Sequence, residues 1–195
     1  YSNKKGWSVS GYDKTETPLT DQLKQEGINI NFEIVDSSIP EEIKKVDLLL
    51  VTTPAISSYH PHLVALKKLG HNAIKRAELL GEITKSKATL AISGTHGKTS
   101  TTALLAHIID GTPQRCNAFI GGISAEIDSN LYYSPNAKWN IVEADEFDRS
   151  FHHLHPTHAV ITSLDPDHLD VYGSEPNFIE AFKIFASQVK EKVVI

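Results

Sequence analysis

The sequence is poor in cysteine, lacks methionine and contains no long apolar run. Its single cysteine, Cys116, cannot form a disulfide within the chain, and no apolar segment approaches the ~20 residues that a membrane-spanning helix needs. Positive charge is scarce as well, because a net charge of -5 offers no basic surface that would attract a nucleic acid. We therefore expect a cytoplasmic protein that binds no nucleic acid and inserts into no membrane. Nothing in the sequence indicates an oligomeric state.

Hydrophobic residues make up 40% of the 195 positions and charged residues 22%, which is typical of one large or two small globular domains. The chain begins with Tyr1 rather than methionine, and residues 192–195 (KVVI) resemble the first residues of a strand. We therefore expect a fragment of a longer chain.

Short apolar runs alternate with amphipathic stretches over residues 1–84. Strands are predicted at 7–12, 28–34 and 47–53, and helices at 19–26, 60–69 and 76–83. Strands that alternate with helices favour a parallel sheet covered by helices. We predict a first α/β domain over 1–84, with its boundary at the polar link 84–87.

A second α/β domain is predicted over 85–195. Its strands are expected at 88–93, 117–120, 139–144 and 158–164, and its helices at 99–109 and 177–189. The predicted fold class is therefore α/β throughout.

The strongest signal is a loop between the first strand and the first helix of this second domain. Its residues are Gly94, Thr95, His96, Gly97, Lys98, Thr99 and Ser100. Glycines let backbone N–H groups turn inward around phosphate oxygens, and the following helix presents its positive end to the same anion. Lys98 would neutralise the β and γ phosphates of ATP, and the Thr99 hydroxyl would bind Mg²⁺.

Two points about this loop stay open. The usual phosphate-loop pattern has a further glycine at the position of Ile92, so the match is to a shorter G-T-x-G-K-T variant. A chance turn with a helix-capping threonine is the alternative, but the order of strand, loop and helix favours phosphate binding. His96 either contacts a substrate or only packs against the loop.

Acidic residues follow the predicted strand 139–144, at Glu143, Asp145, Glu146 and Asp148. Open α/β sheets bind ligands at the carboxyl ends of their strands, so Glu143 could hold Mg²⁺ opposite Thr99. A solvated acidic turn is the alternative. It fits Glu146 and Asp148 better than Glu143, whose neighbours are apolar.

His168 lies in a third polar segment, 165–170 (DPDHLD), just past the predicted strand 158–164. Because Mg²⁺ prefers oxygen ligands to imidazole, a ligand role for His168 implies a second, weaker Mg²⁺ or Mn²⁺ site. An ordinary surface histidine is the alternative. The histidines between 152 and 158 lack the spacing and the companion ligands of a zinc site.

Together these segments resemble the signature segments of the Mur ligase family. The similar strings are 91–102 (AISGTHGKTSTT), 141–156 (IVEADEFDRSFHHLHP) and 165–173 (DPDHLDVYG), while 10–28 and 51–63 are similar to the first domain of its alanine-adding branch. The resemblance covers nearly the whole chain. It implies a Rossmann-like UDP-binding first domain and a P-loop α/β central ATPase domain, both truncated, with the family's C-terminal domain absent from these residues.

The resemblance also implies a reaction. The muramoyl carboxylate of UDP-N-acetylmuramic acid would attack the γ-phosphate of ATP, and the amine of L-alanine would open the acyl phosphate. Lys98, Glu143 and His168 would be catalytic; Thr99 and Glu143 would bind a first Mg²⁺, and Glu143 and His168 a second. Without the third domain, we expect residues 1–195 to have no ligase activity by themselves.

Some positions depart from the family pattern. Ile120 replaces the asparagine that often precedes the glycine pair, which weakens the prediction that Gly121 and Gly122 contact the substrate. Asp13 is the candidate substrate contact in the first domain. Lys183 stands where sister ligases carry a carbamylated lysine, but the alanine-adding branch usually lacks it, so we interpret Lys183 as a helix-surface residue.

Three other functions compete with alanine addition. They are a recycling ligase that attaches a tripeptide to the same sugar nucleotide, a folylpolyglutamate synthase, and a non-catalytic ATP-binding module. The muramate-type first domain disfavours the synthase. A nucleotide switch is disfavoured because no guanine-specifying Asn-Lys-x-Asp motif follows the loop.

Overall fold

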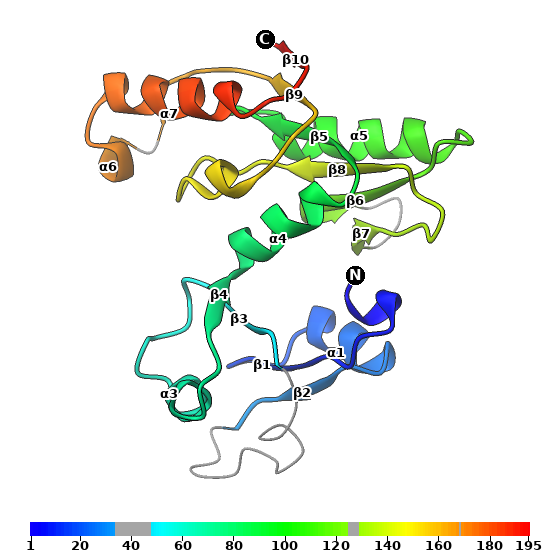
Figure 1. The fold of residues 1–195 in the computed structure, drawn as a ribbon, viewed down its shortest axis with the longest axis vertical. Coiled ribbons are helices and arrows are strands. Elements are labelled where there is room, and N and C mark those ends of the chain that lie inside the picture. Colours follow the sequence, from blue (N-terminus) through cyan, green and yellow to red (C-terminus); the bar gives the residue numbers. More distant parts are fainter. Residues whose placement is uncertain (34–47, 125–128, 168) are drawn as a thin grey trace. The chain divides into compact units, whose positions relative to one another are not determined.

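The computed structural model describes residues 1–33, 48–124, 129–167 and 169–195 (Figure 1). Contacts divide the chain into two compact units, Tyr1–Lys75 and Arg76–Ile195. Among the described helices, none combines the length and the apolar character needed to cross a bilayer. Both units mix helices with strands, which confirms the predicted α/β class.

The first unit is built from two pairs of short parallel strands and their helices. Its elements are η1 (Asn3–Lys5), β1 (Ser10–Tyr12), α1 (Pro18–Gln25), β2 (Asn29–Asn31), β3 (Leu50–Thr52), α3 (Pro61–Lys68) and β4 (Ala73–Lys75). Strand β1 pairs with β2, and β3 pairs with β4. The strands are shorter than the sequence pattern indicates, and β4 is too short to produce a recognisable pattern. Positions 34 and 47, at the ends of two predicted strands, lie outside the described residues.

Helix α1 shows why the predicted helices form where they do. The Thr17 side chain accepts a hydrogen bond from the Thr20 N–H (3.2 Å), and the Thr20 hydroxyl accepts one from the Thr17 N–H (2.8 Å). Pro18 occupies the first turn, where a missing N–H costs no helical hydrogen bond. The helix therefore starts one residue before the predicted position.

The second unit is a six-stranded sheet in the order β10-β9-β5-β8-β6-β7. Its elements are α4 (Arg76–Lys85), β5 (Ala88–Ser93), α5 (Lys98–Asp110), β6 (Cys116–Ser124), β7 (Ser129–Tyr132), β8 (Trp139–Glu143), η2 (Ser150–His153), β9 (His158–Ile161), α6 (Leu169–Tyr172), α7 (Glu175–Ser187) and β10 (Lys192–Val194). All pairs are parallel except β6 with β7 at one edge. The carboxyl ends of β5, β8 and β9 consequently lie at the same edge of the sheet.

Apolar side chains cover both faces of this sheet. On β8, Ile141 belongs to the cluster packed against α5, and its neighbour Val142 belongs to the cluster packed against α7. This alternation follows from the two-residue period of a strand. Figure 1 shows α5 and α7 on opposite sides of the sheet. Because these helices cover the faces of the sheet, a site can form at the carboxyl ends of its strands.

Helix α4 packs on the second unit. Leu80 contacts the α7-side core cluster, and Gly81 faces η2 so closely that an added Cβ would lie 2.3 Å from the His153 carbonyl oxygen. By its contacts the chain therefore divides after Lys75, whereas the sequence pattern places the boundary at the polar link 84–87. The functional division into domains 1–84 and 85–195 stays a prediction.

Replacing Gly81 by alanine is expected to destabilise the protein by about 1–3 kcal/mol, as overpacking does elsewhere. The new methyl group would meet the His153 backbone, which cannot turn aside as a side chain could. Urea denaturation would measure the loss. Gly111→Ala is the control, because the nearest atom to its Cβ is 3.5 Å away. Equal unfolding free energies for the two variants would contradict this account of the α4 contact.

Candidate functional site

The loop between β5 and α5 turns at two glycines. Gly94 has φ 120° and Gly97 has φ 79°, values in the left-handed region that favours glycine. A Cβ on Gly94 would also lie 2.3 Å from Thr162 Oγ1 and 2.8 Å from the Ser163 nitrogen. Position 94 therefore requires glycine both for its backbone conformation and for its close approach to the segment after β9.

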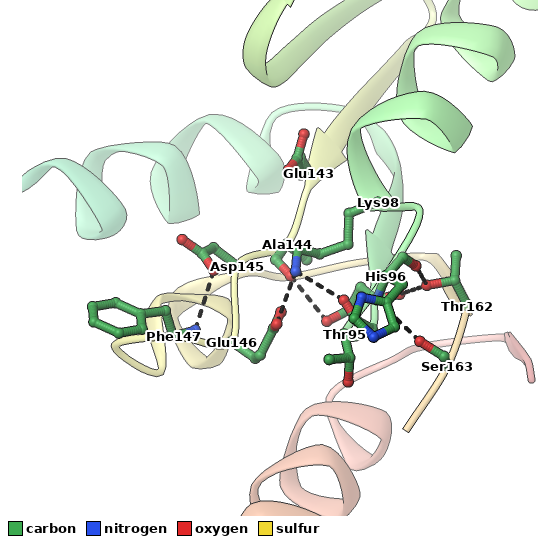
Figure 2. A network of polar contacts seen from close by, with 12 residues as sticks. Thr95, His96, Lys98, Glu143, Ala144, Asp145, Glu146, Phe147, Thr162 and Ser163 are labelled. Carbon is green, nitrogen blue, oxygen red and sulfur yellow. Dashed lines mark hydrogen bonds and ion pairs between the residues drawn. The ribbon is translucent and has the colours of Figure 1, made fainter. Parts of the chain in front are cut away.

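Hydrogen bonds hold this loop to the residues that follow β9 (Figure 2). The Thr95 N–H donates to the Ser163 carbonyl (3.2 Å), and the His96 N–H donates to the Ser163 hydroxyl (3.0 Å). The Thr95 hydroxyl donates to the Asp165 carbonyl (2.7 Å). The His96 side chain is 72% exposed, and its Nε2 lies 3.9 Å from an Asp165 oxygen. The backbone of His96 thus packs against the neighbouring segment while its ring reaches solvent.

Lys98 is the first residue of α5, and its ammonium group has two partners. Nζ donates to the Gly94 carbonyl (2.8 Å) and to Glu146 Oε1 (2.8 Å). The Lys98 side chain is 15% exposed and the Glu146 side chain is fully buried. Figure 2 shows the two side chains reaching toward each other where the loop enters the helix. The loop lysine therefore forms an ion pair in which Glu146 is fully buried and Lys98 is partly buried.

Glu146 does not lie in a solvated turn, which is the arrangement that the sequence pattern favours for it. The turn folds inward because the Phe151 N–H donates to the Asp145 carbonyl (3.0 Å) while the Phe151 ring is fully buried. The Tyr172 hydroxyl donates to the Glu146 carbonyl. Burial, and then the charge of Glu146, raise the pKa of Tyr172 to about 12. Asp148, in contrast, is exposed as expected.

Glu143 ends β8 and faces the start of α5. Its Oε1 accepts a hydrogen bond from the Thr99 hydroxyl (2.9 Å), and its Oε2 accepts one from the Gly121 N–H (2.7 Å). The three residues meet because β8 lies between β5 and β6 in the sheet. A hydroxyl and a carboxylate are the hard oxygen donors that Mg²⁺ prefers, so this donor set fits a magnesium ion.

Two family models match the chain. The Mur ligase middle domain matches residues 92–195, and the Mur ligase family, catalytic domain, matches residues 2–88. The chain belongs to the Mur ligase family. The middle-domain match spans the loop, the Lys98–Glu146 pair and the Glu143 contacts described above.

Curated Mur ligase relatives carry a common name. The UDP-N-acetylmuramate--L-alanine ligase of Porphyromonas gingivalis is 47% identical over 191 residues, which cover 97% of this chain and 42% of that protein. The ligase of the same name from Parabacteroides distasonis is 48% identical over 187 residues, covering 95% of this chain and 40% of that protein. The chain thus spans about two fifths of the length of these relatives.

Solved structures of Mur ligases share the fold. UDP-N-acetylmuramate-alanine ligase MurC from Thermotoga maritima has a TM-score of 0.81 and 26% identity, covering all of this chain and 44% of that one. The tripeptide ligase MPL from Neisseria meningitides has a TM-score of 0.80 and 24% identity, covering 96% of this chain and 62% of that one. The second likeness shows the fold alone.

Among the remaining predicted site residues, Gly122 adjoins α5, and the others are exposed or lie outside the described residues. Gly122 lies beside Thr99, since a Cβ on it would be 3.7 Å from the threonine Cγ2. Asp13 is exposed in the first unit and accepts a hydrogen bond from the Thr15 N–H (3.1 Å). Ser100 is exposed, and Lys183 is 70% exposed with Glu180 3.8 Å away. His168 lies outside the described residues.

Proposed function

We propose that this chain forms the nucleotide-binding and UDP-sugar-binding part of an ATP-dependent ligase that joins L-alanine to the muramoyl carboxylate of UDP-N-acetylmuramic acid, in peptidoglycan precursor synthesis in the cytoplasm. Relatives about 47% identical that are named for this reaction support the choice of substrates. The observation that supports the ATP assignment is the partly buried Lys98 ammonium, held at the start of α5 beside the two glycines of the loop.

The proposed reaction has two steps. A muramoyl carboxylate oxygen attacks the γ-phosphorus, and the bond from that phosphorus to the β-bridging oxygen breaks to release ADP. The amine of L-alanine then attacks the acyl carbon, inorganic phosphate departs with the electron pair of the C–O bond, the attacking nitrogen loses a proton to solvent, and an amide forms. Charge on the transferring phosphoryl group is the main obstacle in such reactions, so positioned cations and N–H donors provide most of the help.

The loop residues Gly94, Thr95, His96, Gly97, Lys98, Thr99 and Ser100 are proposed to surround the phosphates. The N–H groups at the start of α5 would donate to phosphate oxygens, aided by the positive end of the helix. Lys98 would contact the β and γ phosphates through its remaining N–H. These groups neutralise the phosphates and hold them in place for attack.

Thr99 and Glu143 are proposed to hold Mg²⁺. Their oxygens already lie 2.9 Å apart, which suits two ligands of one small cation after the hydroxyl proton turns away. When bound, the ion would draw negative charge from the phosphate oxygens. Glu143 and His168 are proposed as ligands of a second Mg²⁺ or Mn²⁺.

Residues 1–84 are proposed to bind the UDP part of the sugar nucleotide, with Asp13 as a contact residue. Gly121 and Gly122 are proposed to lie near the muramoyl group, because they adjoin Glu143 and Thr99. In the structure, the Gly121 N–H donates a hydrogen bond to the Glu143 carboxylate.

Phosphate release by the full-length protein tests this function. With ATP and Mg²⁺ present, release is expected only when UDP-N-acetylmuramic acid and L-alanine are supplied together, because the acyl phosphate needs both partners to turn over. Omitting each substrate in turn provides the controls. Rapid release without either one would indicate a nucleotide-hydrolysing module, and preference for a tripeptide over L-alanine would indicate the recycling ligase.

A further inference from the structure

Glu146 is a buried carboxylate to which the proposed reaction assigns no role. It is fully buried, and its Oε1 lies 2.8 Å from the Lys98 ammonium. Its second oxygen, Oε2, is buried without a hydrogen-bond partner among the described residues. A carboxylate present only for stability would be expected to use both oxygens, because an unpaired buried acceptor is destabilising and a buried ion pair is often no better than apolar packing.

The geometry of Lys98 explains what Glu146 contributes. An ammonium group has three N–H donors. One donates to the Gly94 carbonyl and one to Glu146 Oε1, each at 2.8 Å, so within the described parts of the chain a single N–H remains. The lysine side chain is flexible, and one anchor would leave it free to rotate. Two anchors fix both the position of Nζ and the direction of the third N–H.

Glu146 is itself held in place from several sides. Its carbonyl accepts hydrogen bonds from the Tyr172 hydroxyl and from the Arg149 N–H (3.0 Å). The Arg149 guanidinium lies 5.2 Å from the centre of the Tyr172 ring. The backbone of Glu146 is therefore held to α6 and to the turn before η2, which restricts where its buried carboxylate can lie.

The two carboxylates of this turn have separate partners. The Glu143 carboxylate accepts hydrogen bonds from the Thr99 hydroxyl and the Gly121 N–H, whereas the Glu146 carboxylate is hydrogen-bonded only to the Lys98 ammonium among the described side chains. The sheet end thus carries one carboxylate for the proposed metal and another for the lysine.

We infer that Glu146 is a positioning residue, which holds the Lys98 ammonium so that its one remaining N–H points toward the γ-phosphate of ATP. This inference rests on the proposed function. Glu146 acts through Lys98 and touches neither substrate nor metal.

Glu146→Gln in the full-length protein tests the inference. The amide keeps the shape and an acceptor oxygen but removes the charge that holds the ammonium. We expect kcat for phosphate release to fall about 10- to 100-fold, the range expected for one hydrogen bond to a charged group, while KM for L-alanine changes less than about twofold. Asp148→Asn, an exposed carboxylate of the same turn, is the matched control and should leave kcat unchanged.

A double-mutant cycle separates positioning from a structural role. Affinity for a non-hydrolysable ATP analogue, measured by calorimetry, should fall on Glu146→Gln in the wild-type background. In a Lys98→Met background the same change should lower affinity no further, because Glu146 has no ammonium left to position. An equal loss in both backgrounds would overturn the inference. Thermal melting of each variant establishes that it is folded.

The double-mutant cycle can be interpreted even if the protein does not catalyse the proposed ligation. Failure of the wild-type protein to release phosphate with L-alanine would reject the proposed function, while analogue binding would still report on Glu146. Conversely, normal ligation with unchanged kinetics in Glu146→Gln would reject the positioning role alone.

Discussion

Replacing Lys98 by alanine is expected to lower kcat of the full-length ligase about 10²- to 10³-fold, the loss seen when a single preorganised charge-stabilising group is removed. In the proposed mechanism, the substitution removes the cation that would face the transferring phosphoryl group. Affinity for ATP should fall as well, because the β and γ phosphates lose the same contact. Steady-state phosphate release and calorimetric titration with an ATP analogue would measure the two effects.

The same substitution should also destabilise the protein by about 3–5 kcal/mol, because it leaves the fully buried Glu146 without its partner. A double variant, Lys98→Met with Glu146→Leu, removes both charges and should recover most of this stability without recovering activity. Denaturant unfolding distinguishes the two variants.

Lys183→Ala is the control for the loss of a lysine. Its side chain is 70% exposed and its ion pair with Glu180 lies on the helix surface, so stability should change by no more than about 0.5 kcal/mol. Ligase activity should be unchanged. If Lys98→Ala behaved like Lys183→Ala in both measurements, the assignment of the phosphate loop would be untenable.

Sequence patterns predict the backbone of the loop between β5 and α5 well because its signals are local. Two glycines with positive φ and a lysine at the first helical position form one continuous segment between a strand and a helix. The predicted helix 99–109 is confirmed as α5, Lys98–Asp110, and the predicted strand 88–93 is confirmed as β5. The sequence pattern of this part of the chain is therefore recognisable from neighbouring residues, although the folded loop is also held by distant ones such as Ser163.

Glu146 shows where local reasoning fails. In the string EADEFD it has the same polarity and spacing as a solvated turn residue, and its burial depends on Phe151 packing in the core and on Tyr172 from α6. The contact between Gly121 and Glu143 likewise depends on the order of strands in the sheet, which no local pattern specifies. Long-range packing therefore decides which of several acidic residues become part of the site.

Strand β7 and helix α4 are two elements of the fold whose placement local patterns do not predict. β7 is an antiparallel edge strand of four residues, SNLY, which lacks the apolar run of the central strands. Helix α4 has the pattern of an ordinary amphipathic helix, and long-range contacts such as that of Gly81 with η2 and that of Leu80 with the core assign it to the second unit. The position of β7 in the sheet and the assignment of α4 to the second unit both depend on contacts with residues distant in the sequence.

Gly121→Ala is expected to impair catalysis severely while leaving the fold intact. A Cβ at this position would lie 2.7 Å from Glu143 Oε1 and 2.9 Å from its Cδ, so the carboxylate would have to move. Because the clash involves the end of a flexible side chain, the free energy of unfolding should change by less than about 1 kcal/mol. The displaced carboxylate would no longer face Thr99, and kcat should fall about 10²-fold, as expected when a site is misplaced by about 1 Å.

The dependence of activity on Mg²⁺ concentration distinguishes displacement of the Glu143 carboxylate from a general disturbance of the site. If Glu143 binds the ion, the Mg²⁺ concentration that gives half-maximal activity should rise in Gly121→Ala, and excess Mg²⁺ should recover part of the activity. Gly122→Ala is the neighbouring control, because its Cβ would meet only Thr99 Cγ2 at an ordinary 3.7 Å. That variant should retain the Mg²⁺ dependence of the wild type. Equal rises in the half-maximal Mg²⁺ concentration in the two variants, or a Gly121→Ala protein whose activity falls with unaltered Mg²⁺ dependence, would show that Glu143 is not the residue through which Gly121 acts.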